Sequence, residues 1–204
     1  MSSPHPTARR QPAARWQRSR LAATRPADPG AATPLLDHDR LDAVRSRLEE
    51  LHDRGRLQRV VCDPHTVGDG LHLAAMNFRR AVRHLDDPDV AIVFLYQSVV
   101  NTADAVLHCL GYHARDFEGH KVAIAVTSDL VAALLGRSRA QRMAATCERL
   151  RKRRHEALYS RSGVMTLSDA RALLDDCRGF LPRLWALAGG RVGMPAAVEA
   201  AAVA

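Results

Sequence analysis

The sequence predicts an all-α protein, built as an antiparallel bundle of five to six helices. Aromatic residues make up only 4% of the chain, whereas Ala and Leu, which lose little conformational entropy in a helix, are abundant. Apolar residues also recur at intervals of three and four along most of the chain, as on one face of a helix. Because the loops between these segments are short, consecutive helices are expected to run antiparallel.

The chain is expected to divide into three parts. Residues 1–36 are rich in arginine and proline without apolar periodicity, which predicts a disordered tail. Residues 37–188 carry the helical pattern and are long enough for one domain with a sizeable core. Residues 189–204 are expected to form a loose Ala-rich tail.

Charge and composition narrow the classes of function. The formal net charge is +8, but much of it lies in the first 36 residues, and all but two of the 30 basic residues are arginine. Arginine together with abundant alanine is typical of a GC-rich genome, so the charge alone is weak evidence for nucleic-acid binding.

No apolar stretch of membrane-spanning length and no signal peptide is recognised, which predicts a cytoplasmic protein that does not contact a membrane. The four cysteines lack metal or redox spacing, and no Gly-rich phosphate loop is present, so no cofactor is expected.

The first two helices follow from the spacing of apolar residues. Apolar positions three and four residues apart predict a first helix near 38–54 and a second from about 71 to 86. Between them, residues 62–70 contain Pro64 and two glycines and are interpreted as a loop.

The third helix is predicted from a start signal. Asp87-Pro88 places a capping carboxylate before a proline at the first helical position. The segment that follows, near 88–110, begins apolar on every side and has no further Pro or Gly before Gly111. This length favours a central helix over a buried strand.

Three more helices complete the predicted bundle. They are expected near 119–135, near 138–161 and from 166 to about 188, the last opened by a capping box at Thr166 and Asp169. The residues expected to end or bend these helices are Gly136, Gly163, Gly179 and Pro182.

The stretch RLRKRRHEALYS, residues 149–160, holds five basic residues in its first six positions. On a helix, Arg154 falls near the middle of the apolar stripe, whereas Lys152 and Arg153 point away from it. Because an uncompensated buried guanidinium is costly, Arg154 is expected to reach out of the stripe, to pair with a carboxylate, or to face a groove or subunit interface where an anion binds. The other arginines on or beside this face are Arg151 and Arg161.

A second polar feature lies on the predicted central helix. Four polar residues recur at intervals of four, three and four and form one continuous stripe. The stripe is either the solvent edge of the helix or a surface that faces Arg154, in which case Asp104 would pair with the guanidinium. Its members are Gln97, Asn101, Asp104 and His108.

Three segments carry a resemblance to a known family. They are the apolar helix and turn AIVFLYQSVVNTADAVLHCLGY, the helix start EGHKVAIAV and the basic helix end RKRRHEALYS, within about residues 67–187. In these segments the chain resembles the HEPN superfamily of helical domains. The resemblance implies a homodimer whose cleft meets RNA, a nucleotide or a partner protein. Many HEPN domains are metal-independent ribonucleases, often toxins or defence effectors, so a cognate nucleotidyltransferase or antitoxin is an implied partner.

The ribonucleases of that superfamily share a motif of Arg, a polar residue, three further residues and His. Carried onto this sequence, the Arg is Arg154 and the polar residue is His155, but Tyr159 stands at the final position. A tyrosine with an ordinary pKa near 10 is a poor general base at neutral pH, so this departure favours binding over catalysis. If the chain is a metal-independent endoribonuclease, Arg154 would stabilise the scissile phosphate and His155 would transfer protons.

Two further alternatives are less favoured. Residues 137–155 are basic enough for a helix-turn-helix DNA binder, but their apolar stripe indicates that this helix is committed to a core. His108, His113 and His120 are close in sequence, but no Cys or carboxylate completes a familiar metal-ligand pattern, so no metal site is expected. The favoured interpretation is an all-helical dimer with a binding cleft around Arg154.

Overall fold

The computed structural model describes residues 38–115, 119–159, 163 and 165–192 of the 204-residue chain. The chain separates into two units, Met1–Pro34 and Leu35–Ala204, and every described residue belongs to the second. The predicted tail at 1–36 therefore lies outside the described residues, as does most of the predicted C-terminal tail.

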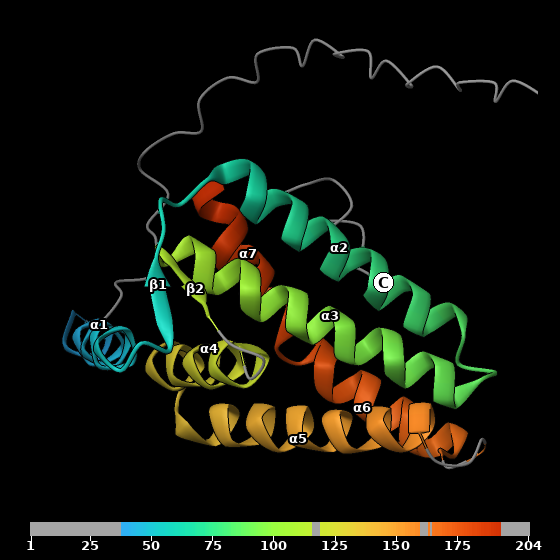
Figure 1. The fold of residues 1–204 in the computed structure, drawn as a ribbon. Coiled ribbons are helices and arrows are strands. Elements are labelled where there is room, and N and C mark those ends of the chain that lie inside the picture. The colour runs from blue at the N-terminus through green and yellow to red at the C-terminus, as the bar shows by residue number, and fades with distance from the viewer. Residues whose placement is uncertain (1–37, 116–118, 160–162, 164, 193–204) are drawn as a thin grey trace, which may run out of the picture. The chain divides into compact units, whose positions relative to one another are not determined.

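Helices dominate the described part of the chain (Figure 1). They are α1 (His38–Asp53), α2 (Pro64–Arg83), α3 (Pro88–Cys109), α4 (Gly119–Leu135), α5 (Arg137–Tyr159), α6 (Leu167–Arg178) and α7 (Leu181–Val192). Two short strands, β1 (Leu57–Arg59) and β2 (Tyr112–Ala114), follow α1 and α3 and pair antiparallel. The all-α class is confirmed, and the expected number of helices is met when α6 and α7, predicted as one bent helix, are counted together.

Helix α3 forms the centre of the bundle, as its apolar sequence predicted. It contacts α2, α4, α5, α6 and α7, and Figure 1 shows α2 lying along it. Contrary to expectation, α3 is long and apolar enough by composition to cross a membrane, but 67% of its apolar window is buried inside the bundle. Burial on most sides is the property expected of a core helix.

A chain of buried hydrogen bonds joins three helices in this core. The Ser98 hydroxyl donates to the Ala74 carbonyl of α2 at 2.8 Å. One turn along α3, the Thr102 hydroxyl donates to the Ser98 carbonyl at 2.8 Å and accepts from Trp185 Nε1 of α7 at 2.9 Å. Each of these bonds satisfies a polar group that would be costly to bury alone.

Helices α2 and α3 begin in the same way. At each start an aspartate precedes a proline and accepts backbone N–H bonds of the first turn: Asp63 from His65 and Thr66, and Asp87 from Val90. The start of α3 was predicted correctly. Helix α2 begins at Pro64, so the interpretation of residues 62–70 as a loop was wrong.

The C-terminal segment breaks into α6 and α7 close to the predicted bend. Thr166 caps α6 by accepting a hydrogen bond from the Asp169 N–H at 3.1 Å, as predicted. At the other end, the Gly179 N–H donates to the carbonyls of Asp175 and Asp176. A Cβ on Gly179 would lie 3.1 Å from the Asp176 carbonyl oxygen, so glycine relieves a close approach at this corner. Helix α7 then runs to Val192.

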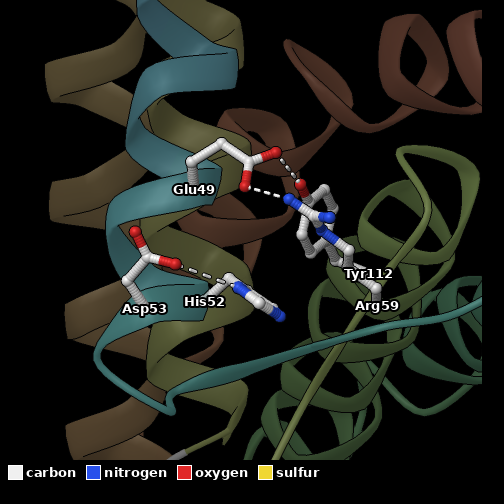
Figure 2. A network of polar contacts seen from close by, with 5 residues as sticks. All are labelled: Glu49, His52, Asp53, Arg59 and Tyr112. Atoms are coloured by element: carbon white, nitrogen blue, oxygen red, sulfur yellow. Dashed lines mark hydrogen bonds and ion pairs between the residues drawn. The ribbon is translucent and has the colours of Figure 1, made fainter.

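A polar network fastens α1 to the two strands (Figure 2). The Glu49 carboxylate accepts a hydrogen bond of 2.7 Å from the Tyr112 hydroxyl of β2 and pairs with Arg59 of β1. The bonds from Tyr112 and Arg59 lower the pKa of Glu49 below its ordinary value. Beside them, His52 pairs with Asp53 at 3.2 Å. This network was not expected from the sequence, because it joins segments far apart in the chain.

Candidate functional site

The basic run on α5 divides into paired and unpaired side chains. Four of its five basic residues lie within 4 Å of a carboxylate. These ion pairs are Arg149–Asp176 at 3.4 Å, Arg151–Glu148 at 2.8 Å, Lys152–Glu148 at 3.9 Å and Arg153–Glu156 at 2.9 Å. They are more than a third exposed, and such pairs contribute little to stability.

Arg154 is the fifth member, and its surroundings differ. Its side chain is half-buried, and its guanidinium carbon lies 5.2 Å from the centroid of the Tyr96 ring on α3. Among the described residues no carboxylate pairs with it. A cation over an aromatic face is stabilised by the ring quadrupole while its N–H groups stay available to a further acceptor. The prediction that Arg154 turns towards the bundle is therefore confirmed.

Tyr96 provides a neutral platform for this cation. Its side chain is buried, with 7% exposure, in the third turn of α3. Burial raises the pKa of the Tyr96 hydroxyl, and the nearby charges of Arg154 and Arg151 only partly oppose that shift. The hydroxyl therefore stays protonated at neutral pH, and Tyr96 does not neutralise Arg154. Tyr96 was read from the sequence only as part of an apolar run.

A groove of about 430 Å³ opens beside Tyr96, between α4 and α5. Its small side chains, among them Ala125, Ser128 and Ala144, leave room between the two helices. Two basic residues, Lys121 and Arg151, and two acidic residues, Asp129 and Glu148, line it, and Arg151 pairs with Glu148. Its full lining is Tyr96, Lys121, Ile124, Ala125, Ser128, Asp129, Ala144, Cys147, Glu148 and Arg151. Arg154 is thus held on an aromatic ring that also borders an open groove.

His155 and Tyr159, the other two motif residues, lie one turn apart on the outside of α5. Both are exposed, Tyr159 by 72%, and their ring centroids are 5.0 Å apart. Leu158 beside them is also 46% exposed. Arg161, which was expected to share the face of Arg154, lies outside the described residues.

The polar residues of the α3 stripe contact one another and His120, and none of them pairs with Arg154 among the described residues. Gln97 donates a hydrogen bond to Asn101 at 3.1 Å within the stripe. Asp104 lies 3.7 Å from His120 at the start of α4, so the proposed pairing of Asp104 with Arg154 is wrong. The physical reason is the position of Asp104, two turns beyond Tyr96 along α3 and beside the first turn of α4.

Histidines surround Asp104 at the end of α3. The ring centroids of His108 and His113 are 5.2 Å apart. Burial raises the pKa of Asp104 and the positive charge of the three nearby histidines opposes that rise. Burial, followed by the neighbouring His113, lowers the pKa of His108. Within the described part of the chain, no three or more His, Cys, Asp or Glu side chains are arranged to hold a metal ion.

An unpredicted contact holds the C-terminal end of α5 in place. Asp89, in the first turn of α3, accepts hydrogen bonds from the backbone N–H groups of Gly163 at 2.6 Å and Met165 at 3.1 Å. These residues belong to the connection between α5 and α6. Because Asp89 and Tyr96 lie on the same helix, α3 positions both this connection and Arg154.

Comparison with known proteins yields no relative. No protein-family model, no curated protein and no solved structure matches the chain.

Proposed function

We propose that this chain is a HEPN-like helical domain that binds single-stranded RNA, with Arg154 as the contact to a backbone phosphate. The observation that carries the proposal is the half-buried guanidinium over Tyr96, which has no carboxylate partner among the described residues. A guanidinium presents several N–H donors in a planar fork that fits phosphate oxygens. Within the described part of α5, the other four basic residues of the run pair with carboxylates and Arg154 does not.

The surroundings of Arg154 favour an extended single strand of RNA over a compact small-molecule ligand. The groove beside Tyr96 is open, and its two basic residues, Lys121 and Arg151, are balanced by Asp129 and Glu148, so the charge available to a phosphate is that of Arg154 next to it. Proteins bind single strands with basic side chains beside aromatic rings, and RNA is read mainly in its unpaired segments. A DNA duplex is less well supported, because residues on the inner face of α5, such as Met143 and Leu150, are buried in the core.

The binding test compares two matched variants with the wild type. Fluorescence anisotropy of a labelled single-stranded RNA measures affinity for wild type, Arg154→Ala and Lys152→Ala. Lys152 carries the same charge on the same helix but is exposed and pairs weakly with Glu148, at 3.9 Å. A hydrogen-bonded contact with a charged partner is worth about 1.5–3 kcal/mol, so Arg154→Ala should weaken binding by about 10- to 100-fold. Lys152→Ala should change it by less than about threefold. Equal losses in the two variants would refute a specific role for Arg154.

Wild type, Arg154→Ala and one further variant, His155→Ala, test the ribonuclease alternative. The observation that favours it is the exposed His155, next to Arg154 in the chain and in ring contact with Tyr159. RNA incubated with wild type in EDTA and resolved on a denaturing gel should stay intact if the domain only binds. Cleavage that is lost in both Arg154→Ala and His155→Ala would establish catalysis instead.

We also propose that two copies meet at the C-terminal end of α5. Leu158 and Tyr159 expose apolar surface there, one turn from Arg154. Light scattering on a sizing column should show a dimer for wild type and a monomer for Leu158→Asp combined with Tyr159→Asp. A monomeric wild type would remove this part of the proposal.

A further inference from the structure

Four helices, α4 to α7, border a second groove of about 330 Å³. It shares no lining residue with the groove beside Tyr96. Its size is within the range of small-molecule sites in proteins. Its lining is Val131, Leu135, Arg139, Arg142, Met143, Thr146, Asp175, Asp176, Gly179, Phe180 and Arg183.

Three exposed arginines line this groove. Arg139 and Arg142 lie three residues apart on α5 and therefore share a face, and Arg183 comes from α7. None of the three forms an ion pair with a described carboxylate, and Arg139 makes only a long contact of 3.4 Å to the Leu135 carbonyl. Three positive charges against the two negative charges of Asp175 and Asp176 leave the groove lining net positive, which favours an added anion.

The two carboxylates of the groove are engaged with other partners. Asp175 accepts a hydrogen bond from Arg178 at 3.1 Å. Asp176 accepts from Thr146 at 3.3 Å and from Arg149 at 3.4 Å. Both guanidinium partners lie outside the groove lining. The carboxylates therefore form no ion pair with the three groove arginines among the described residues, and the three arginines outnumber them in the lining.

The interior of the groove is apolar. Val131 and Met143 are each 1% exposed and Phe180 is 7% exposed, so the apolar part of the lining is firmly packed against the core and Phe180 presents the larger exposed fraction. A ligand that fits this combination has a compact anionic group and an apolar body. Three guanidinium groups match a doubly charged phosphate monoester better than a single carboxylate, because each fork can bond two oxygens.

We propose that this groove binds a small organic phosphate, with Arg139, Arg142 and Arg183 on the phosphate and the apolar body against Met143 and Phe180. The proposal is independent of RNA binding at Arg154, because the two grooves have no residue in common.

Titration of ¹⁵N-labelled full-length protein with phenyl phosphate, followed by amide chemical shifts, tests the proposal. Shift changes should cluster at groove residues such as Thr146 and Gly179. Arg142→Ala combined with Arg183→Ala should weaken binding at least about tenfold. The control, Lys152→Ala combined with Arg153→Ala, removes the same charge from α5 outside the groove and should weaken binding less than about threefold. Arg154→Ala should leave the affinity unchanged.

Two comparisons complete the test. Inorganic phosphate and glycerol 3-phosphate should bind more weakly than phenyl phosphate, by on the order of tenfold, because they bury no apolar body. Equal affinity for all three would overturn the proposal, and so would equal losses in the two double variants. Thermal unfolding of each variant without ligand shows that it is folded, and phenyl phosphate should raise the melting temperature of wild type but not of Arg142→Ala/Arg183→Ala.

Discussion

The indole N–H of Trp185 donates a hydrogen bond of 2.9 Å to the hydroxyl of Thr102, in the interior between α7 and α3. Trp185 has no exposed surface and Thr102 has 1%. The bond therefore replaces water for a donor that cannot reach solvent. Thr102 in turn donates to the Ser98 carbonyl, and Ser98 donates to Ala74 of α2, so the bond between Trp185 and Thr102 belongs to a chain that connects α7, α3 and α2.

Thr102→Val should destabilise the fold, because it leaves the Trp185 N–H buried without an acceptor. The expected cost is about 1–3 kcal/mol in the free energy of unfolding, measured by urea denaturation. Thr127→Val is the matched control, since Thr127 is equally buried but its hydroxyl donates only to the Ala123 carbonyl of its own helix. Equal losses in the two variants would show that the bond to Trp185 has no special weight.

Tyr96 should matter to RNA affinity through its ring and not through its hydroxyl. Tyr96→Phe keeps an aromatic face beneath Arg154 and should bind RNA nearly as well as wild type. Tyr96→Leu removes the face and should weaken binding by roughly 2- to 30-fold, from a cation–π contribution of about 0.5–2 kcal/mol. Anisotropy titrations measure both, and a loss in Tyr96→Phe as large as that in Tyr96→Leu would contradict this role of the ring.

Protonation of His108 should lower the free energy of unfolding as the pH falls below neutrality. Its pKa is lowered in the folded state by burial and by His113, so the unfolded chain takes up the proton at a higher pH than the folded chain does. The stability it contributes is complete above its ordinary pKa of about 6.5 and is lost as the pH falls below that value towards the folded pKa. Asp104 acts with the opposite sign, because its pKa is raised in the folded state, so the folded chain takes up that proton more readily than the unfolded chain does.

The measurement is the melting temperature between about pH 7.5 and 5, a range around the ordinary pKa of histidine. Wild type should melt at lower temperatures as the pH falls below about 6.5, and His108→Gln should show a flatter profile. The charged groups that act on His108 are His113, Asp104 and Asp63. If both proteins follow the same profile, another group controls the acid response.

Much of the fold could be predicted from local signals. The helical pattern of apolar residues located α1, α4 and α5, the length without internal Gly or Pro located α3, and the capping residues placed the starts of α3 and α6. The same signal was present at Asp63-Pro64 and was missed, because two glycines in the first turns of α2 were taken as evidence for a loop. Glycine within a helix costs about 1 kcal/mol against alanine. The cap and the buried face of α2 outweigh that cost.

The candidate site was predicted only in part, because its partners are distant in the sequence. The helical wheel showed the direction of Arg154 from residues within two turns of it. Tyr96, its actual neighbour, lies on another helix, and no spacing rule connects them. Asp104 was one of two alternatives left open for the polar stripe, since a carboxylate is the usual partner of a buried guanidinium. The offset of the helices brings Asp104 to His120 instead.

The most direct test of RNA binding through Arg154 is the salt dependence of RNA affinity. For a single strand, the logarithm of the affinity falls with the logarithm of the salt concentration by about 0.7 for each phosphate contact. If Arg154 binds a backbone phosphate, Arg154→Ala should reduce this slope by about 0.7, whereas Tyr96→Phe should leave it unchanged. An Arg154→Ala variant with the wild-type slope and affinity would contradict the proposed phosphate contact.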